Sequence, residues 1–262
     1  MNKQVVDSTD LLIAKVNDKV RLSKSKNQIM YTDFLNEQEM RKVEKYLIQN
    51  NISGYTFFGG YDNAIRKALI TYPEEKLEKE MVESNYNKIF SCIRIKLNSE
   101  LVGKYEHRDY LSGIMKLGIE REKIGDIIVL DDLADIIVFK ENLEYLIANL
   151  RLLTRFKKCE ISEIPLEEIT VKDAKFDDIS IIVNSMRIDN FVSELAHTSR
   201  NRAAEFIEFG RVLLNYEEVF KSSKQVQEGD VITIRGKGKF IIGSIERQTR
   251  SGKNVVKVKK YV

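Results

Sequence analysis

The stretch between residues 185 and 238 constrains the fold of this chain most, because it predicts two short, closely packed helices that lead into a small sheet. Apolar side chains spaced i, i+3, i+4 and i+7 predict the buried face of the first helix, namely Ile188, Phe191, Val192 and Leu195. Ser199 is a suitable N-cap for the second helix. Ala203 and Ala204 then allow close packing, and Gly210 suits the left-handed residue that ends this helix.

Arginines border the predicted helix pair. A guanidinium group is costly to bury without a partner, so we expect most of them to face solvent, namely Arg187, Arg200, Arg202 and Arg211. A compact helix pair bordered by arginines provides a surface for phosphate groups. This pattern predicts RNA-binding residues, and we include Ser199 among them.

This segment resembles the RNA-binding module named for ribosomal protein S-four. The module has the pattern Arg-apolar-Asp, helix, Ser-Arg-x-x-Ala, helix ending in Gly, apolar-x-apolar-Asn, and Gly-Asp-x-Ile. The matching residues are Arg187, Asp189, Ser199, Arg200, Ala203, Gly210, Asn215, Gly229, Asp230 and Ile232. The chain departs from the pattern at Tyr216-Glu217, where the module usually turns through Asn-Gly. The resemblance implies that Asp189 is structural and pairs with nearby donors.

Positive charge is concentrated near the C-terminal end. The net charge of +3 divides unevenly, because Ser180 to Val262 holds 15 Lys and Arg against 9 Asp and Glu. After Ile234, nine cations accompany only Glu246. Such a surplus is expected of a segment that meets a polyanion. The further RNA-binding residues that we predict are Lys224, Arg235, Lys237, Lys239, Arg247, Arg250 and Lys253.

Composition argues against several other classes of protein. Hydrophobic content of 43% with 32% charged residues indicates a soluble globular chain. No apolar run reaches the length of a membrane span, and the polar start, Met1 to Asp10, predicts no signal peptide. Two cysteines and two histidines supply neither a metal site nor a nucleophile and base. We therefore expect a cytoplasmic protein without a cofactor, a metal or catalytic residues.

The order of expected elements predicts an α+β chain of three small domains. Residues 1–73 form a mixed α/β domain, 74–178 a ferredoxin-like βαββαβ domain related in plan to RNA-recognition domains, and 179–262 the S-four-type module with basic C-terminal strands. The central domain is expected to follow a charged helix from Glu74 to Ser84. Its expected elements are strand 89–97, helix 107–117, strands 127–130 and 135–139, helix 142–150, and a last strand near 156–161.

The whole chain resembles the YlmH family of cytoplasmic bacterial RNA-binding proteins. The residues that carry this resemblance are Phe58-Gly-Gly-Tyr61, Ala64, Arg66-Lys67, His107-Arg-Asp109, Leu111, Gly113, Leu117-Gly-Ile119, Arg121, Gly125-Asp126-Ile127, the 235–240 run, Thr249 and Gly252. Ile65 stands where a Glu is usual. The resemblance implies a ribosome-associated protein that contacts ribosomal RNA and tRNA on the large subunit. It further implies a role with quality-control factors on stalled subunits, where peptidyl-tRNA is held during alanine tailing.

Two other functions stay open. The same module could dock an RNA-modification enzyme, or an accessory of one, whose chemistry lies in residues 1–170. The chain could also be a scaffold in cell division, since the family's gene lies in a cell-division cluster. The absence of a catalytic set in the sequence favours the RNA-binding hypothesis.

Overall fold

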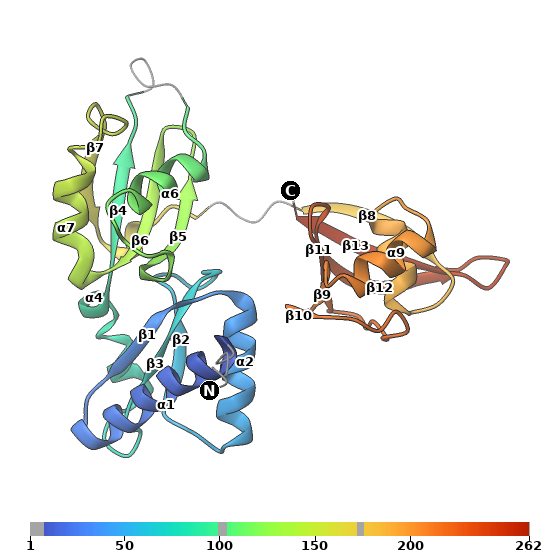
Figure 1. Cartoon of the computed structure of the whole chain (residues 1–262), viewed down its shortest axis with the longest axis horizontal. Coiled ribbons are helices and arrows are strands. Elements are labelled where there is room, and N and C mark those ends of the chain that lie inside the picture. The colour runs from blue at the N-terminus through green and yellow to red at the C-terminus, as the bar shows by residue number, and fades with distance from the viewer. Residues whose placement is uncertain (1–7, 99–103, 172–175, 262) are drawn as a thin grey trace, which may run out of the picture. The chain divides into compact units, whose positions relative to one another are not determined.

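The computed structural model describes residues 8–98, 104–171 and 176–261, which fall into two compact units, Met1–Lys172 and Asp173–Val262. The first unit contains two sheets and the second contains one (Figure 1). Both units mix helices with strands, so the predicted α+β class is confirmed. The division of the first unit at residues 73 and 74 stays a prediction.

A three-stranded sheet with two helices opens the first unit: α1 (Ser8–Lys26), β1 (Met30–Leu35), α2 (Glu37–Gln49), β2 (Tyr55–Phe58) and β3 (Lys67–Thr71). The strands are antiparallel in the order β1-β3-β2. Helix α2 begins with a capping box, in which Asn36 and Glu39 each accept from the other's backbone amide. The sequence pattern does not predict β1, because its register shifts between Tyr31 and Phe34 and the alternation typical of a strand is lost.

The two faces of this first sheet have different partners. Val16 of α1 and Leu47 of α2 are fully buried with Leu69 on one face. Phe34 and Ile70 point to the opposite face and belong to a core that includes residues of the next sheet. The N-terminal sheet therefore lies between its own helices and the central sheet.

The central sheet confirms the βαββαβ plan. Its strands are antiparallel in the order β5-β6-β4-β7, with β4 (Phe90–Lys96), β5 (Ile124–Val129), β6 (Leu133–Phe139) and β7 (Glu160–Ile164). The helical elements are α3 (Lys79–Glu83), α4 (Tyr86–Ile89), α6 (His107–Met115), η1 (Arg121–Lys123), α7 (Lys140–Leu150) and η2 (Leu166–Glu168). The charged helix is shorter than expected. The last strand also begins later, because Phe156 is fully buried in a turn against Gly113.

Both faces of the central sheet are covered. Ile93 and Ile95 point to the face that α6 and α7 cover. Cys92 and Ile137 point to the other face, where they share a core with Phe34 of the first sheet. Successive residues of one strand are therefore buried on opposite sides, as in a sheet that lies between two layers.

An ion pair lies on this second face of the central sheet. Arg94 donates two hydrogen bonds of 2.7 Å to the carboxylate of the fully buried Asp135. The segment after η2 completes the pair, since the Thr170 amide donates to Asp135 and the Glu168 carbonyl accepts from Arg94. A buried carboxylate needs such partners. The open aromatic sheet surface on which RNA-recognition domains stack bases is therefore absent from the described part of this sheet.

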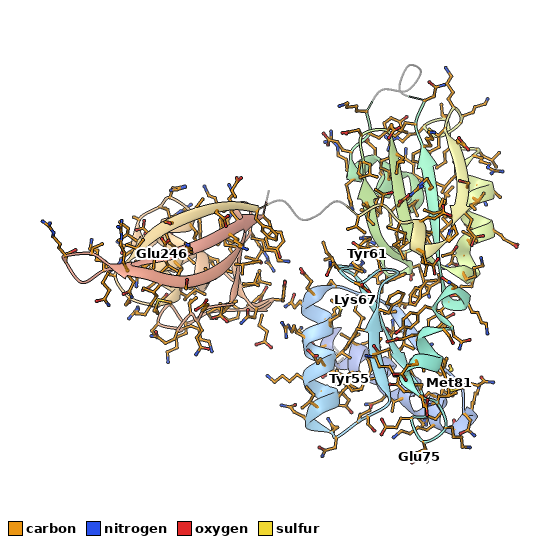
Figure 2. The ribbon with its side chains drawn as sticks, turned by 180° about the vertical axis from the view of Figure 1, so that it is seen from behind. Tyr55, Tyr61, Lys67, Glu75, Met81 and Glu246 are labelled. Atoms are coloured by element: carbon orange, nitrogen blue, oxygen red, sulfur yellow. The ribbon has the colours of Figure 1, made fainter. Side chains whose placement is uncertain are left out.

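A hydrogen-bonded junction around Asp126 joins the loop between β2 and β3 to β5. The Asp126 carboxylate accepts from the Tyr61 hydroxyl at 2.8 Å and from the amides of Ile65 and Arg66 at 2.6 and 3.0 Å. The guanidinium groups of Arg66 and Arg121 donate to carbonyls of β1 and β5. Burial raises the pKa of Tyr61, and the nearby Asp126 charge raises it further. Tyr61 lies at the end of the first sheet nearest the central one (Figure 2).

The second unit is a six-stranded sheet with a helix pair. Its elements are β8 (Phe176–Val183), α8 (Ile188–Leu195), α9 (Arg200–Glu208), β9 (Val212–Leu214), β10 (Glu217–Glu218), β11 (Val231–Ile234), β12 (Gly238–Gln248) and β13 (Asn254–Tyr261). The strand order is β10-β9-β11-β12-β13-β8. The helix predictions are confirmed, because Ser199 caps α9 and Gly210 follows it with φ of +64°.

The hairpin between β9 and β10 keeps a tight turn without the usual Asn-Gly. Asn215 and Tyr216 both have positive φ, of 51° and 68°, as a two-residue type I′ turn requires. Asn215 also donates to Asp230 at 2.8 Å and accepts from the Val231 amide at 2.9 Å. These bonds hold the turn against the start of β11.

Candidate nucleic-acid interface

Arg187 and Arg200 each contact a residue in the first turn of α8. Arg187 is the N-cap residue and makes a bidentate pair with Asp189, the shorter bond being 2.6 Å. This pair confirms that Asp189 is structural, and the same hydrogen bonds raise the pKa of Arg187. Arg200, from the start of α9, donates to the side chain of Asn190, which in turn donates to Ser185. The partner of Arg200 is a neutral amide, so this hydrogen bond brings no opposing charge to the guanidinium group.

Arg202 and Arg211 lie over one aromatic ring at the other end of this surface. Their guanidinium carbons are 5.6 and 4.6 Å from the centre of the Phe206 ring. Arg211 also donates to the backbone carbonyl of Arg235 at 3.3 Å, while Arg235 pairs with Glu218 at 2.8 Å. The helix pair is thereby connected to the turn between β11 and β12.

That turn carries the next predicted residues. Gly236 and Gly238 adopt positive φ, of 79° and 132°, and Lys237 between them is exposed. The Lys239 ammonium lies over the rings of Tyr216 and Tyr261, at 4.7 and 4.9 Å from their centres. Lys239 is therefore held near the β9–β10 hairpin.

The remaining predicted residues fall into two places. Lys224 lies in a loop whose backbone pairs with the start of α8, close to Arg187. Arg247, Arg250 and Lys253 lie at the far end of the β12–β13 hairpin instead. Strand β12 is 11 residues long, so this tip is about 30 Å from the β11–β12 turn. The structure thus places eight of the twelve predicted residues on the helix pair, the loop beside it and the β11–β12 turn. It places Lys239 on the other face of the sheet, because the next residue, Phe240, is buried in the core under the helices, and it separates the three residues of the hairpin tip.

Several of the arginines have acidic partners. Asp189, Glu205 and Glu218 neutralise Arg187, Arg202 and Arg235, respectively. In all three pairs the arginine side chain keeps 43–59% of its surface exposed. The carboxylates of Glu205 and Glu218 are themselves partly exposed, so an incoming phosphate can replace them at Arg202 and Arg235, whereas Asp189 is largely buried and stays paired with Arg187.

Ser199 has a structural role that can be separated from RNA contact. Its hydroxyl accepts from the Arg202 amide at 3.3 Å, so Ser199→Ala is expected to lower the free energy of unfolding by about 1 kcal/mol. Ser199→Asp keeps an N-cap acceptor, and we expect near-normal stability with weaker RNA binding because the new charge repels phosphate. Urea denaturation and RNA titration of both variants test this. Equal RNA affinity in wild type and Ser199→Asp would show that Ser199 is not part of the RNA interface.

Sequence reasoning did not find Lys221, Gln225 or Gln227, which line a pocket beside Lys224. They lie in an irregular loop, where no periodic spacing indicates which side chains face one another. No group of three His, Cys, Asp or Glu in the described parts of the chain is arranged to hold a metal ion. Among the helices described, none has the length and apolar character needed to cross a membrane.

Two domain families match this chain. Residues 83–173 match the family described as "Putative RNA-binding domain in YlmH", and residues 186–232 match the S4 domain. The chain thus carries a YlmH-type RNA-binding domain followed by an S4 domain. A relative of this chain, the ribosome-associated protein quality control protein P2 of Bacillus subtilis, is 28% identical over 238 residues, covering 89% of the chain and 88% of the relative.

A solved structure supports the fold of this chain. The cell division protein ylmH from Streptococcus pneumoniae aligns with a TM-score of 0.50 and 18% identity. The alignment covers 65% of this chain and 99% of that structure. At this identity the likeness concerns the fold alone.

Proposed function

We propose that this protein is a non-enzymatic, cytoplasmic binder of structured RNA that acts on the large ribosomal subunit, where it contacts ribosomal RNA and tRNA. Its place is in quality control of stalled ribosomes, including alanine tailing, together with other factors on the stalled subunit. The observation that carries this proposal is a set of arginines that border the helix pair and the adjoining turn of one S4-containing unit, namely Arg187, Arg200, Arg202, Arg211 and Arg235. The name of the Bacillus subtilis relative supports the ribosomal setting.

Binding of a folded RNA follows from the chemistry of this surface. Guanidinium groups donate paired hydrogen bonds to phosphate oxygens, and each neutralised phosphate releases counterions. The cations of the helix pair continue onto the β11–β12 turn, so they can follow a sugar–phosphate backbone. A surface of this kind recognises the shape of an A-form helix rather than its base edges.

Charge reversal at Arg200 tests the proposal. Arg200→Glu is expected to weaken co-sedimentation with large ribosomal subunits by about tenfold or more, because a charged hydrogen bond of about 1.5–3 kcal/mol becomes a repulsion. Arg21→Glu is the matched control, since Arg21 is an exposed arginine of α1 that also has a single side-chain partner, Asp18. Circular dichroism melting of both variants verifies that they fold.

Comparison of the two variants distinguishes binding through the S4 surface from a general effect of protein charge. Loss of binding in Arg200→Glu with normal binding in Arg21→Glu supports the proposal. Unchanged pelleting of Arg200→Glu, or equal losses in the two variants, contradicts it. Purified subunits with and without bound tRNA then show whether tRNA contributes to the binding.

A further inference from the structure

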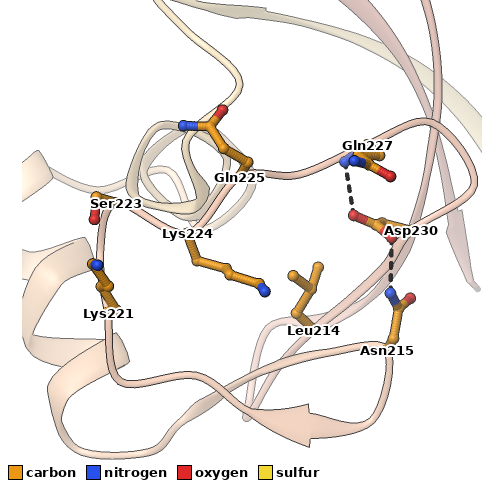
Figure 3. Close-up of a pocket in the computed structure, with 8 residues that line it drawn as sticks. All are labelled: Leu214, Asn215, Lys221, Ser223, Lys224, Gln225, Gln227 and Asp230. Atoms are coloured by element: carbon orange, nitrogen blue, oxygen red, sulfur yellow. Dashed lines mark hydrogen bonds between the residues drawn. The ribbon is translucent and has the colours of Figure 1, made fainter.

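A polar pocket lies beside the helix pair of the second unit. It has a volume of about 490 Å³ and is formed by the end of β9 and the loop that leads to β11 (Figure 3). Its lining includes Asn215, Lys221, Lys224, Gln225 and Gln227. The ammonium group of Lys224 extends across the pocket toward Leu214 (Figure 3).

Backbone hydrogen bonds fix the pocket next to the arginines. The Ile188 amide donates to the Lys224 carbonyl at 2.8 Å, and the Val226 amide donates to the Met186 carbonyl at 2.8 Å. Arg187 lies between Met186 and Ile188 in the chain, and its backbone forms an isolated antiparallel β-bridge with Gln225. A polyanion bound along the arginines of the helix pair would therefore pass the mouth of this pocket.

The pocket lining carries more positive than negative charge. Its one lining carboxylate, Asp230, accepts from the Asn215 side chain at 2.8 Å and from the Gln227 amide at 2.7 Å (Figure 3). Within the described chain, neither Lys221 nor Lys224 pairs with an acid, and the side-chain amides of Gln225 and Gln227 make no hydrogen bond. Two ammonium groups and the side-chain amide of Gln227 are thus available to a ligand, whereas the Gln225 side chain extends away from Lys224 and Leu214 (Figure 3).

We propose that this pocket binds one unstacked nucleotide of the RNA held by the arginine surface, and this proposal rests on the proposed function. Lys221 and Lys224 bind its phosphate. The side-chain amide of Gln227, which both donates and accepts, binds the edge of the base, and Leu214 contacts the base ring. Recognition of unstacked bases through their edges is how proteins read single-stranded RNA. The volume lies in the range of pockets that enclose small molecules and exceeds what a phosphate alone requires.

Titration of the full chain with nucleoside 5′-monophosphates tests this pocket. Saturation-transfer NMR detects contact with base protons, and inorganic phosphate serves as the competing anion. We expect saturable binding of at least one nucleotide. Lys224→Ala is expected to weaken this binding about tenfold through loss of a charged hydrogen bond. Gln227→Ala should weaken nucleotide binding while leaving the binding of inorganic phosphate unaffected.

Lys45→Ala is the charge-matched control, because Lys45 is exposed on α2 and makes no hydrogen bond or ion pair within the described residues. Three results would overturn the proposal: no saturable binding of any nucleotide, equal losses in Lys45→Ala and Lys224→Ala, or unaltered nucleotide binding in Gln227→Ala. The titration needs no ribosome. Failure of wild-type protein to pellet with subunits would therefore contradict the proposed function separately.

Discussion

Asp126→Ala is expected to lower the free energy of unfolding of the first unit by about 3 kcal/mol. The carboxylate is 9% exposed and accepts three hydrogen bonds, from Tyr61, Ile65 and Arg66. Alanine leaves these donors without a partner. It also removes the negative charge beside the half-buried guanidinium groups of Arg66 and Arg121, whose pKa values burial already lowers.

Amide hydrogen exchange measures the loss of stability at the residues whose hydrogen bonds to Asp126 are removed. In Asp126→Ala the amides of Ile65 and Arg66 should exchange much faster, and urea should unfold the first unit at a lower concentration. Asp131→Ala is the control, because Asp131 is exposed and makes no side-chain hydrogen bond within the described residues. A surface change of this kind alters stability by no more than about 0.5 kcal/mol. Equal protection at residues 65 and 66 in wild type and Asp126→Ala would show that the junction does not stabilise the fold.

RNA affinity is expected to fall about a thousandfold when monovalent salt rises from 50 to 200 mM. The helix pair, the loop beside it and the β11–β12 turn hold seven of the predicted cations, namely Arg187, Arg200, Arg202, Arg211, Lys224, Arg235 and Lys237. Six to ten phosphate contacts produce a loss of this size, because each contact releases condensed counterions. Fluorescence anisotropy with a structured RNA at several salt concentrations gives the slope of log affinity against log salt.

Single substitutions show which cations contribute to that slope. Arg211→Ala should reduce its magnitude by about one, whereas Lys45→Ala should leave it unchanged. The tip residues of the β12–β13 hairpin provide a second comparison. Because they lie about 30 Å from the β11–β12 turn, a short RNA that spans only the helix pair should show no change on Arg250→Ala. A slope close to zero in wild type would show that phosphate contacts do not dominate binding.

Local rules predicted the helix pair of the second unit well. Ser199, Gly210 and the apolar spacing of α8 act within a few residues, so their effect can be read from the sequence. Elements that depend on distant partners were harder to place. Phe156 has the side chain of a strand residue, but it fills a space that Gly113 leaves in α6, and β7 begins four residues later.

Part of the candidate interface could also be predicted, because it depends on spacing within single helices. Spacing along two helices predicts that their arginines face outward, and the structure leaves these side chains accessible. The pairing of Arg235 with Glu218 joins residues 17 positions apart and has no sequence signature. The pocket likewise forms only when residues 222–226 meet the start of α8, so no spacing indicates it.

The core shared by the two sheets of the first unit limits how this protein can be rearranged by gene fusion. Phe34 and Ile70 cover Cys92 and Ile137 on the side of the central sheet away from α6 and α7. A fusion that transferred only the central domain would leave that side bare, and a bare apolar surface promotes aggregation. Any fusion that contains the central domain must therefore also contain the N-terminal strands that cover it.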